Sequence, residues 1–310
     1  MPVLILDALA SADHAVPPGH PEHPGRYEAA KAALQGVEGA HWVKAKPATR
    51  AQLERFHTGA HIDRVLEAAA MAGEGELVAL DADTIVSSAS AGAGLQAAGA
   101  VVQAAEMVMT EPERTAFCLA RPPGHHAEPD RAMGFCLFNS VAIGACHALE
   151  ALGRERVAII DIDVHHGNGS QCLAERDERV FFASLHQAPL YPGTGTRKET
   201  GLNGNVLNIP LPDQTSAMLW RQHFEAELIP ALKVFRPQLV FVSAGFDAHL
   251  DDPLGGLCLE DADYAWIASQ LLSCAHETAE SRLVSVMEGG YDCPSLGRST
   301  AAFTAALATG

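Results

Sequence analysis

The sequence has 310 residues, 48% of them hydrophobic, and a formal net charge of −17 with only 21 lysines and arginines. This length is enough for one large α/β domain or two small ones. The acidic balance opposes the basic surface that nucleic-acid binding requires, so we expect no nucleic-acid partner. The sequence contains no run of eighteen apolar residues, so we expect no membrane span. The short apolar segment at residues 3–6 resembles a first strand more than a signal peptide.

The seven cysteines, at positions 118, 136, 146, 172, 258, 274 and 293, form no CxxC pair and follow no regular framework. Such scattered cysteines are typical of reduced thiols and not of disulfides or a thiolate zinc site. We therefore expect a cytoplasmic protein.

Predicted strands and helices alternate along the chain. Apolar, β-branched runs predict strands at 3–6, 115–119, 157–162, 180–185, 205–210, 239–244 and 283–287. Helical patterns predict one helix that begins near residue 27 and further helices at 48–56, 59–72, 92–109, 139–152, 216–235, 261–278 and 295–307. We find no linker and no internal repeat. The pattern predicts a single domain over residues 1–310, with one doubly wound, mostly parallel sheet between two helix layers.

Residues 157–171, VAIIDIDVHHGNGSQ, carry the most unusual combination of residues in the chain. A buried strand runs into Asp161, Asp163 and His165, which share one side because strand side chains alternate. A buried carboxylate costs several kcal/mol unless it is paired or binds a metal. Polar residues at the carboxyl end of a parallel strand lie where open α/β sheets bind their ligands. We interpret the stretch as half of a metal site.

Asp247 follows another predicted buried strand, in the segment SAGFDAHLDDPLGG. With Asp163 and His165 it completes a set of two carboxylates and one imidazole that leaves coordination positions open. Open coordination by oxygen and nitrogen is typical of a catalytic Zn²⁺, with Fe²⁺ or Co²⁺ as substitutes. The alternative is that Asp247 caps a turn while Asp163 pairs with an arginine.

His125 and His126 follow the strand at 115–119, in the loop RPPGHHAE. Imidazoles beside a metal-bound water suit general acid and base catalysis, because their pKa lies near neutrality. Each needs a partner for its second nitrogen, and Asp161 and Asn168 are the candidates. The alternative is that one of the two histidines is a third metal ligand.

Three aromatic residues lie in loops that follow strands. Tyr291, in the glycine turn EGGY, could donate a hydrogen bond to an oxyanion that develops beside the metal. Phe135 and Tyr191 could wall a slot for a long aliphatic group, or they could simply cover the core.

Taken together, these segments resemble the histone deacetylase superfamily, which includes acetylpolyamine amidohydrolases and bacterial histone deacetylase-like amidohydrolases. The matching motifs are RPPGHHAEPDRAMGFCLFNSVAIGA (121–145), DIDVHHGNGSQ (161–171), SLHQAPLYPGTG (184–195), SAGFDAHLDDPLGG (243–256) and EGGYD (288–292), with weaker matches at 20–26 and 80–90. The resemblance implies the arginase/deacetylase fold, a three-layer αβα domain with an eight-stranded, mostly parallel sheet.

The resemblance also implies roles for individual residues. It makes Asp163, His165 and Asp247 the ligands of one Zn²⁺ per chain. It pairs His125 with Asp161 and His126 with Asn168, with His126 acting as general base and then general acid. Tyr291 polarises the acyl carbonyl by the same comparison.

Further site residues follow from the same comparison. Gly134, Phe135 and Tyr191 line an acyl-lysine tunnel, and Arg26 lies near an internal exit channel. A structural K⁺ is implied, held by Asp161 and by the backbone carbonyls of Asp163, His165, Ser184 and Leu185.

The sequence departs from parts of the family in informative ways. Asn168 stands where class I members carry aspartate, and Glu288 begins EGGY where class I has GGGY, so both resemble class II. Leu254 follows Asp252-Pro253 where a polyamine-specialised member has glutamate, which argues against a charged gate for polyamines. A second potassium site is poorly matched.

We therefore expect zinc-dependent hydrolysis of an N-acyl amide, such as acetyl-lysine or a small acylated amine, releasing acetate and the free amine. One alternative is an acetylpolyamine amidohydrolase, and another is a ureohydrolase with two manganese ions. A third, from a different class, is a metal-dependent protein that binds acyl ligands without turnover. The resemblance allows a homo-oligomer.

Overall fold

The computed structural model describes residues 2–309, and its centre is one sheet of eight parallel strands. The strand order is β2-β1-β5-β10-β9-β6-β7-β8, and every neighbouring pair is parallel. The strands are β1 (Val3–Asp7), β2 (Ala40–Lys44), β5 (Thr115–Leu119), β6 (Val157–Asp161), β7 (Val180–Gln187), β8 (Val206–Leu211), β9 (Val240–Ala244) and β10 (Leu283–Met287). The predicted sheet is confirmed.

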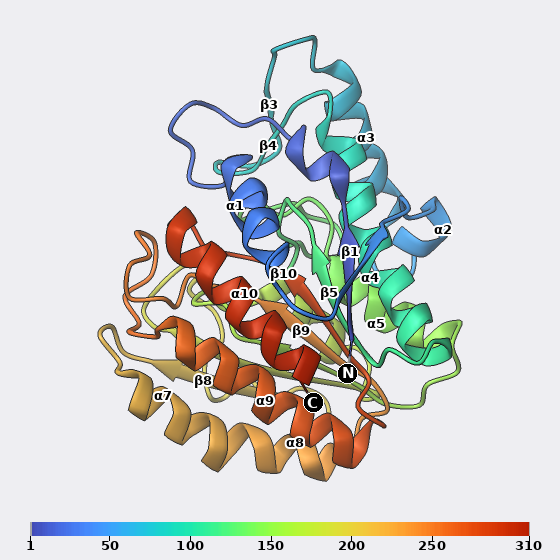
Figure 1. The fold of residues 1–310 in the computed structure, drawn as a ribbon. Helices are drawn as coiled ribbons and strands as arrows, with labels where there is room; N and C mark the ends of the chain where they lie inside the picture. The colour runs from blue at the N-terminus through green and yellow to red at the C-terminus, as the bar shows by residue number, and fades with distance from the viewer. Residues whose placement is uncertain (1, 310) are drawn as a thin grey trace.

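Helices cover both faces of this sheet (Figure 1). The α-helices are α1 (Gly25–Leu34), α2 (Arg50–Leu53), α3 (Gly59–Met71), α4 (Ser90–Thr110), α5 (Ser140–Glu150), α6 (Asn168–Ala174), α7 (Ala217–His223), α8 (Ile229–Phe235), α9 (Asp261–Thr278) and α10 (Cys293–Thr309). One core cluster joins the sheet to α1, α7, α8, α9 and α10, and the other joins it to α4, α5 and α6. The sheet and the helices on its two faces therefore form the three-layer αβα architecture that we expected from the resemblance.

The side chains of β6 alternate between the two cores. Ala158 and Ile160 belong to the cluster under α9 and α10, whereas Val157 and Ile159 belong to the cluster under α4 and α5. Both faces are therefore apolar, which explains the uninterrupted hydrophobic run in the sequence.

The sequence prediction failed at several points outside the central strands. It missed β2, which lies beside β1 at the edge of the sheet. Residues 80–90 contain part of a small antiparallel hairpin, β3 (Val78–Ala79) with β4 (Ile85–Val86). The helix predicted over 48–56 is limited to α2, and a 3₁₀ turn, η1 (Leu9–Ala12), follows β1.

The helix predicted over 216–235 is interrupted by a π-helical turn, η2 (Phe224–Leu228), between α7 and α8. Pro230 lies in the first turn of α8, and it has no N–H group to donate to the carbonyl one turn earlier. The missing donor accounts for the change of hydrogen-bond pattern at this point.

The strand order brings four loops to one edge of the sheet. β5, β10, β9 and β6 are neighbours, although β9 and β10 come last in the sequence. The segments that leave their carboxyl ends carry the paired histidines, the EGGY turn, Asp247 and the Asp161–His165 motif. In a parallel sheet this edge is where ligands bind.

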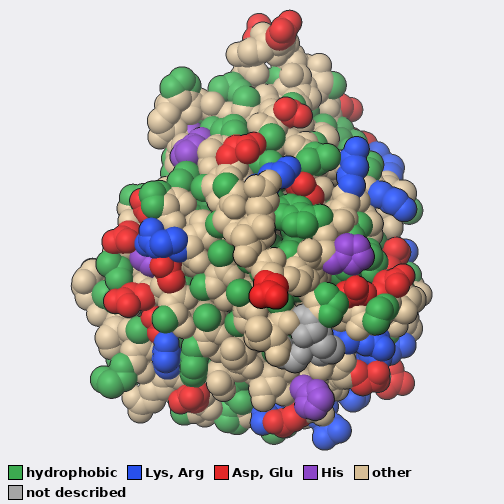
Figure 2. Space-filling model, viewed as in Figure 1, with side chains coloured by type: hydrophobic (Ala, Val, Ile, Leu, Met, Phe, Trp, Pro, Cys, Tyr) green, Lys and Arg blue, Asp and Glu red, His purple; other side chains and the backbone are tan. Residues whose placement is uncertain are grey.

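The surface agrees with the acidic composition. On the face in Figure 2, lysines and arginines lie in small separate groups among aspartates and glutamates. Among residues 2–309, no helix combines the length and the apolar character needed to cross a membrane. All seven cysteines lie in this range and none forms a disulfide.

The loop at residues 17–26 buries a charged side chain. Glu22 is fully buried and accepts hydrogen bonds from Arg121 at 2.7 Å and from Arg26 at 2.9 Å. Burial alone would raise the pKa of Glu22, but Arg121, His14 and Arg26 outweigh it and hold the pKa well below its usual range. This ion pair joins the N-terminal loop to the segment after β5.

We predict that Glu22→Gln lowers the free energy of unfolding by about 3–5 kcal/mol, because it leaves two buried guanidinium groups without their anion. Urea denaturation measures the loss. The matched control is Glu227→Gln, which breaks the half-exposed pair with Arg197 and should cost less than about 1 kcal/mol. Equal losses in the two variants would contradict the prediction.

Candidate metal centre and active site

The three predicted metal ligands come together at the carboxyl ends of β6 and β9. Asp163, His165 and Asp247 are buried, and each offers a ligand atom within 4.8 Å of the others. His165 Nδ1 lies 3.0 Å from Asp163 Oδ1 and 3.1 Å from Asp247 Oδ2. Two carboxylates and one imidazole could bind one divalent cation and leave positions open.

The structure does not match the alternative in which Asp163 pairs with an arginine while Asp247 caps a turn. Within residues 2–309, the ion-pair partners of Asp163 are His125 and His165, and none is an arginine. Asp247 does accept a hydrogen bond from the Val164 N–H, at 2.8 Å, through Oδ1. Its other oxygen still faces His165, so the backbone contact fixes the carboxylate without using up its ligand atom.

Backbone groups hold Asp163 in place. Its Oδ2 accepts from the N–H of Gly289 at 2.8 Å, and its Oδ1 accepts from the N–H of His165 at 2.9 Å. A Cβ at position 289 would lie 2.0 Å from Asp247 Oδ2 and 2.6 Å from Asp163 Oδ2. The first glycine of EGGY is therefore required by the close approach of the two carboxylates.

Burial lowers the pKa of His165, but hydrogen bonds to Asp163 and Asp247 outweigh it and raise the pKa to about 10. A cation that binds these three side chains therefore competes with a proton on the imidazole.

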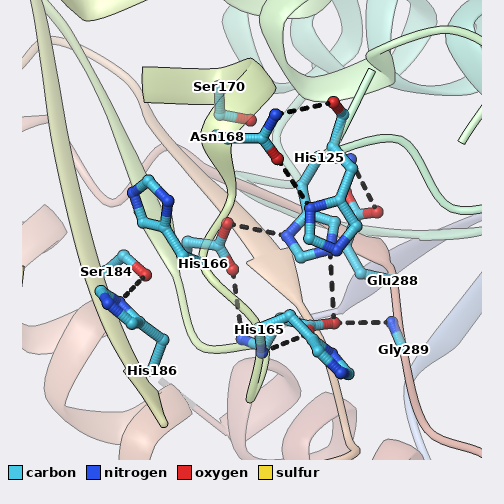
Figure 3. Close-up of polar contacts among 12 residues, drawn as sticks. His125, His165, His166, Asn168, Ser170, Ser184, His186, Glu288 and Gly289 are labelled. Carbon is cyan, nitrogen blue, oxygen red and sulfur yellow. Dashed lines mark hydrogen bonds and ion pairs between the residues drawn. The ribbon is translucent and has the colours of Figure 1, made fainter. Parts of the chain in front are cut away.

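The paired histidines lie beside this group, each with the predicted partner (Figure 3). His125 Nδ1 lies 3.0 Å from Asp161 Oδ2, and His126 Nδ1 lies 2.9 Å from Asn168 Oδ1. The two rings are 4.0 Å apart between centroids. Although the residues are adjacent in sequence, the loop therefore directs both rings into one site.

Glu288 anchors the loop that carries the histidines, a role that the sequence did not reveal. Its Oε2 accepts from the N–H groups of Gly124 at 2.6 Å and His125 at 3.2 Å (Figure 3). Glu288 is fully buried, and burial raises its pKa to about 7 although His125 opposes the shift.

The two imidazoles have opposite electrostatic surroundings. Burial lowers the pKa of His125, but Asp163 and Asp161 outweigh it and raise the pKa well above its ordinary value. Burial also lowers the pKa of His126, and the neighbouring His125 and His165 lower it further. His126 is therefore the neutral ring of the pair, and only a neutral imidazole can accept a proton.

Tyr291 lies on the opposite side of the site from β6, under a buried guanidinium. Arg26 lies 4.7 Å above the Tyr291 ring and donates to the carbonyls of Glu288 and Gly290, each at 2.5 Å. The Tyr291 N–H donates to Asp252 Oδ2 at 2.6 Å. Burial raises the pKa of the phenol well above its ordinary value despite Arg26, so Tyr291 keeps its proton as a donor.

Gly134 and Phe135 form a tight turn with φ angles of 58° and 66°. Met133 and Cys136 exchange backbone hydrogen bonds around it, and two positive φ angles are the signature of a type I′ turn. Such angles are rare for phenylalanine. The Gly134 and Phe135 N–H groups donate to Asp83 and Thr84, both at 3.1 Å, which holds the strained turn in place.

The two predicted tunnel aromatics both contact site residues. The Phe135 ring lies 6.0 Å from that of Tyr291 and 4.8 Å from that of His20. The Tyr191 ring lies 5.1 Å from that of His126 and is 39% exposed. Both aromatic rings therefore lie beside residues of the candidate site.

The remaining predicted residues lie nearby. The Leu254 N–H donates to Asp252 Oδ1 at 2.9 Å, so one carboxylate links Leu254 to Tyr291. Asp161 faces Ser184 in the β6–β7 register, and Leu185 follows it. Ser184 Oγ lies 2.9 Å from His186 Nδ1.

A scan against protein-family models matches the histone deacetylase domain to residues 20–307. The chain belongs to the histone deacetylase family. Membership supports deacetylase-type hydrolysis of an acylated amine by a metal-dependent site, which is consistent with the buried Asp163, His165 and Asp247.

Individual relatives agree with this placement. The chain is 39% identical to a probable deacetylase of Methanothermobacter thermautotrophicus, over 93% of this chain and 86% of that one. It is 37% identical to a histone deacetylase-like amidohydrolase of Pseudomonas aeruginosa, over 80% and 65%. A crystal structure of the HDA15 HD domain superposes with a TM-score of 0.89 at 32% identity, over 97% and 87%. The chain matches less than two thirds of the length of several curated relatives.

We predict that Gly289→Ala lowers the affinity for zinc by about 10–100-fold, because the added methyl displaces two ligand carboxylates. Competition with a chromogenic chelator measures the affinity. Gly92→Ala in α4 is the control, since its Cβ would meet no atom within 4 Å. Unchanged zinc affinity in Gly289→Ala would show that the carboxylates do not bind the metal.

Proposed function

We propose that this histone deacetylase family member hydrolyses N-acyl amides, with acetyl-lysine or a small acylated amine as substrate and Zn²⁺ as its metal. The observation that carries the proposal is the arrangement of Asp163, His165 and Asp247 beside one charged and one neutral imidazole. The two oxygen donors and one nitrogen donor suit zinc. When bound, zinc would lower the pKa of a coordinated water from about 15.7 to about 7 and polarise the substrate carbonyl.

His126 is the proposed general base. It takes a proton from the attacking water, whose oxygen forms a bond to the carbonyl carbon. Tyr291 donates a hydrogen bond to the carbonyl oxygen as negative charge develops on it. His126 then gives the proton to the amide nitrogen, the C–N bond breaks, and acetate and the free amine leave.

His125 and the aromatic walls have supporting roles in this proposal. Asp161 holds the His125 ring in position beside His126. Phe135 and Tyr191 flank the aliphatic chain of the substrate, and Gly134 lies against the His126 ring. A Cβ at Gly134 would lie 2.4 Å from the His126 ring, so only glycine fits there.

Leu254 supports acyl-lysine over acetylpolyamine as substrate. A leucine side chain cannot pair with the second ammonium group of a polyamine, and the carboxylate of Asp252 beside it is buried.

We also propose a structural K⁺ held by Asp161 with the carbonyls of Asp163, His165, Ser184 and Leu185. We further propose a cytoplasmic location, because the seven cysteines form no disulfide.

The purified, zinc-loaded protein should release acetate from an acetyl-lysine peptide faster than from acetylputrescine, as measured by kcat/KM. A preference for acetylputrescine would favour the acetylpolyamine alternative. Binding of both compounds without any acetate release would favour a non-catalytic binding protein.

Tyr291→Phe should lower kcat on the acetyl-lysine peptide by about 10²–10³-fold, because it removes one donor to the oxyanion. Zinc content and the urea midpoint should stay at wild-type values, since the phenylalanine ring can still pack under Arg26. Tyr27→Phe, which removes a buried hydroxyl bonded to Asp7 and leaves Tyr291 unchanged, serves as the control. Wild-type turnover in Tyr291→Phe would exclude the proposed role of its hydroxyl.

A further inference from the structure

We propose that Glu128 is a positioning residue that fixes the orientation of the Asn168 amide and thereby selects the tautomer of His126. The inference rests on the proposed function, in which His126 accepts a proton. It concerns a contact that lies one step behind the imidazole and away from the metal ligands.

The Asn168 side chain, labelled in Figure 3, bridges His126 and three hydrogen-bond acceptors. Its Nδ2 lies 2.8 Å from Glu128 Oε1, 3.3 Å from the His126 carbonyl and 3.4 Å from Met133 Sδ. Its Oδ1 lies 2.9 Å from His126 Nδ1. Only 7% of Asn168 is exposed, so water cannot readily replace these partners.

The chemistry of these neighbours determines which end of the amide faces the imidazole. A carboxylate, a carbonyl and a thioether all accept hydrogen bonds, and none of them donates one. If the amide turned by 180°, its oxygen would face all three acceptors and the Glu128 carboxylate would lose its donor. Glu128 carries the only formal charge of the three, so it dominates the preference.

The orientation of Asn168 in turn fixes the proton on His126. The amide oxygen can only accept, so His126 Nδ1 must carry the hydrogen. A neutral ring has one N–H, and Nε2 is therefore left with a free electron pair. The reversed amide would donate to Nδ1 and place the proton on Nε2, where the ring could no longer act as a base.

The same contact explains why residue 168 is asparagine here. An aspartate in this position would place a second carboxylate oxygen at the 2.8 Å contact with Glu128 Oε1. Like charges at that distance repel, and one of the two would have to hold a proton. Glu128 and Asn168 therefore form a matched pair, and changing one should require changing the other.

The test is a double-mutant cycle on the zinc-loaded full-length protein. Glu128→Lys replaces the acceptor with a donor, so the amide oxygen turns towards the lysine and the wrong tautomer of His126 is selected. We expect kcat on the acetyl-lysine peptide to fall by about 10²–10⁴-fold, the contribution of a general base, with little change in KM. Asn168→Asp alone should also lower kcat.

The double variant Glu128→Lys/Asn168→Asp should recover kcat to within about tenfold of the wild type, because aspartate has one acceptor oxygen for His126 and one for the lysine. Glu128→Gln keeps a carbonyl acceptor and should retain most of the activity. Asp130→Lys, the same charge reversal at an exposed position of this loop, is the control. A double variant no better than Glu128→Lys would overturn the inference.

A second measurement does not depend on turnover. In zinc-loaded protein with ¹⁵N-labelled histidine, and with His126→Gln to assign the signals, the His126 resonances should show protonated Nδ1 and unprotonated Nε2. Glu128→Lys should reverse this pattern, and the double variant should restore it. If Glu128→Lys does not fold, Glu128→Leu, which only removes the acceptor, should give a mixture of tautomers.

The two measurements separate the inference from the function on which it rests. A wild-type protein that hydrolyses no acyl amide but shows the Nδ1–H tautomer, reversed in Glu128→Lys, would refute the proposed function and keep the role of Glu128. A wild-type protein with its His126 proton on Nε2 would overturn the role of Glu128, whatever the activity.

Discussion

The buried carboxylates of Asp163 and Asp247 lie close together, and their closeness constrains the residues around them. Asp163 and Asp247 end neighbouring central strands, and both lie within hydrogen-bond distance of one imidazole nitrogen. Burying such charges costs several kcal/mol for each ion unless a positive charge compensates them. The requirement for glycine at position 289 follows from the closeness of the two carboxylates, and so does the raised pKa of His165.

The sheet topology makes the constraint possible. β9 and β10 are the last strands in the sequence, yet they lie between β5 and β6. Four loops from distant parts of the chain therefore meet at one edge, and each supplies a different part of the site. The same packing gives the adjacent histidines opposite charge states, because His125 faces two aspartates while His126 faces an amide.

The central strands, and the grouping of Asp163, His165 and Asp247 at their ends, could be predicted from the sequence because the patterns are local. The apolar run that ends in Asp-x-Asp-x-His predicts both the strand and the side on which Asp161, Asp163 and His165 lie. β2 could not be found in this way, because its side chains are half-buried or exposed and its sequence AHWVK shows no clear period. The burial of Glu22 was missed because its partner Arg121 is distant in sequence.

Glu128 and Glu288 show a second limit of sequence reasoning. A glutamate in a loop is normally solvated, and the sequence around Glu128 and Glu288 does not show which groups they contact. Their importance depends on what lies opposite them, namely the Asn168 amide for one and two backbone N–H groups for the other. Such partners become visible only when the loops are placed in space.

Anomalous diffraction from crystals of zinc-loaded protein, measured on both sides of the zinc absorption edge, addresses the metal centre most directly. We expect one peak per chain, in contact with Asp163, His165 and Asp247 and facing the His126 ring. Fully loaded crystals with no peak between these three side chains, or with zinc bound only elsewhere, would contradict the proposed centre and the hydrolysis assigned to it.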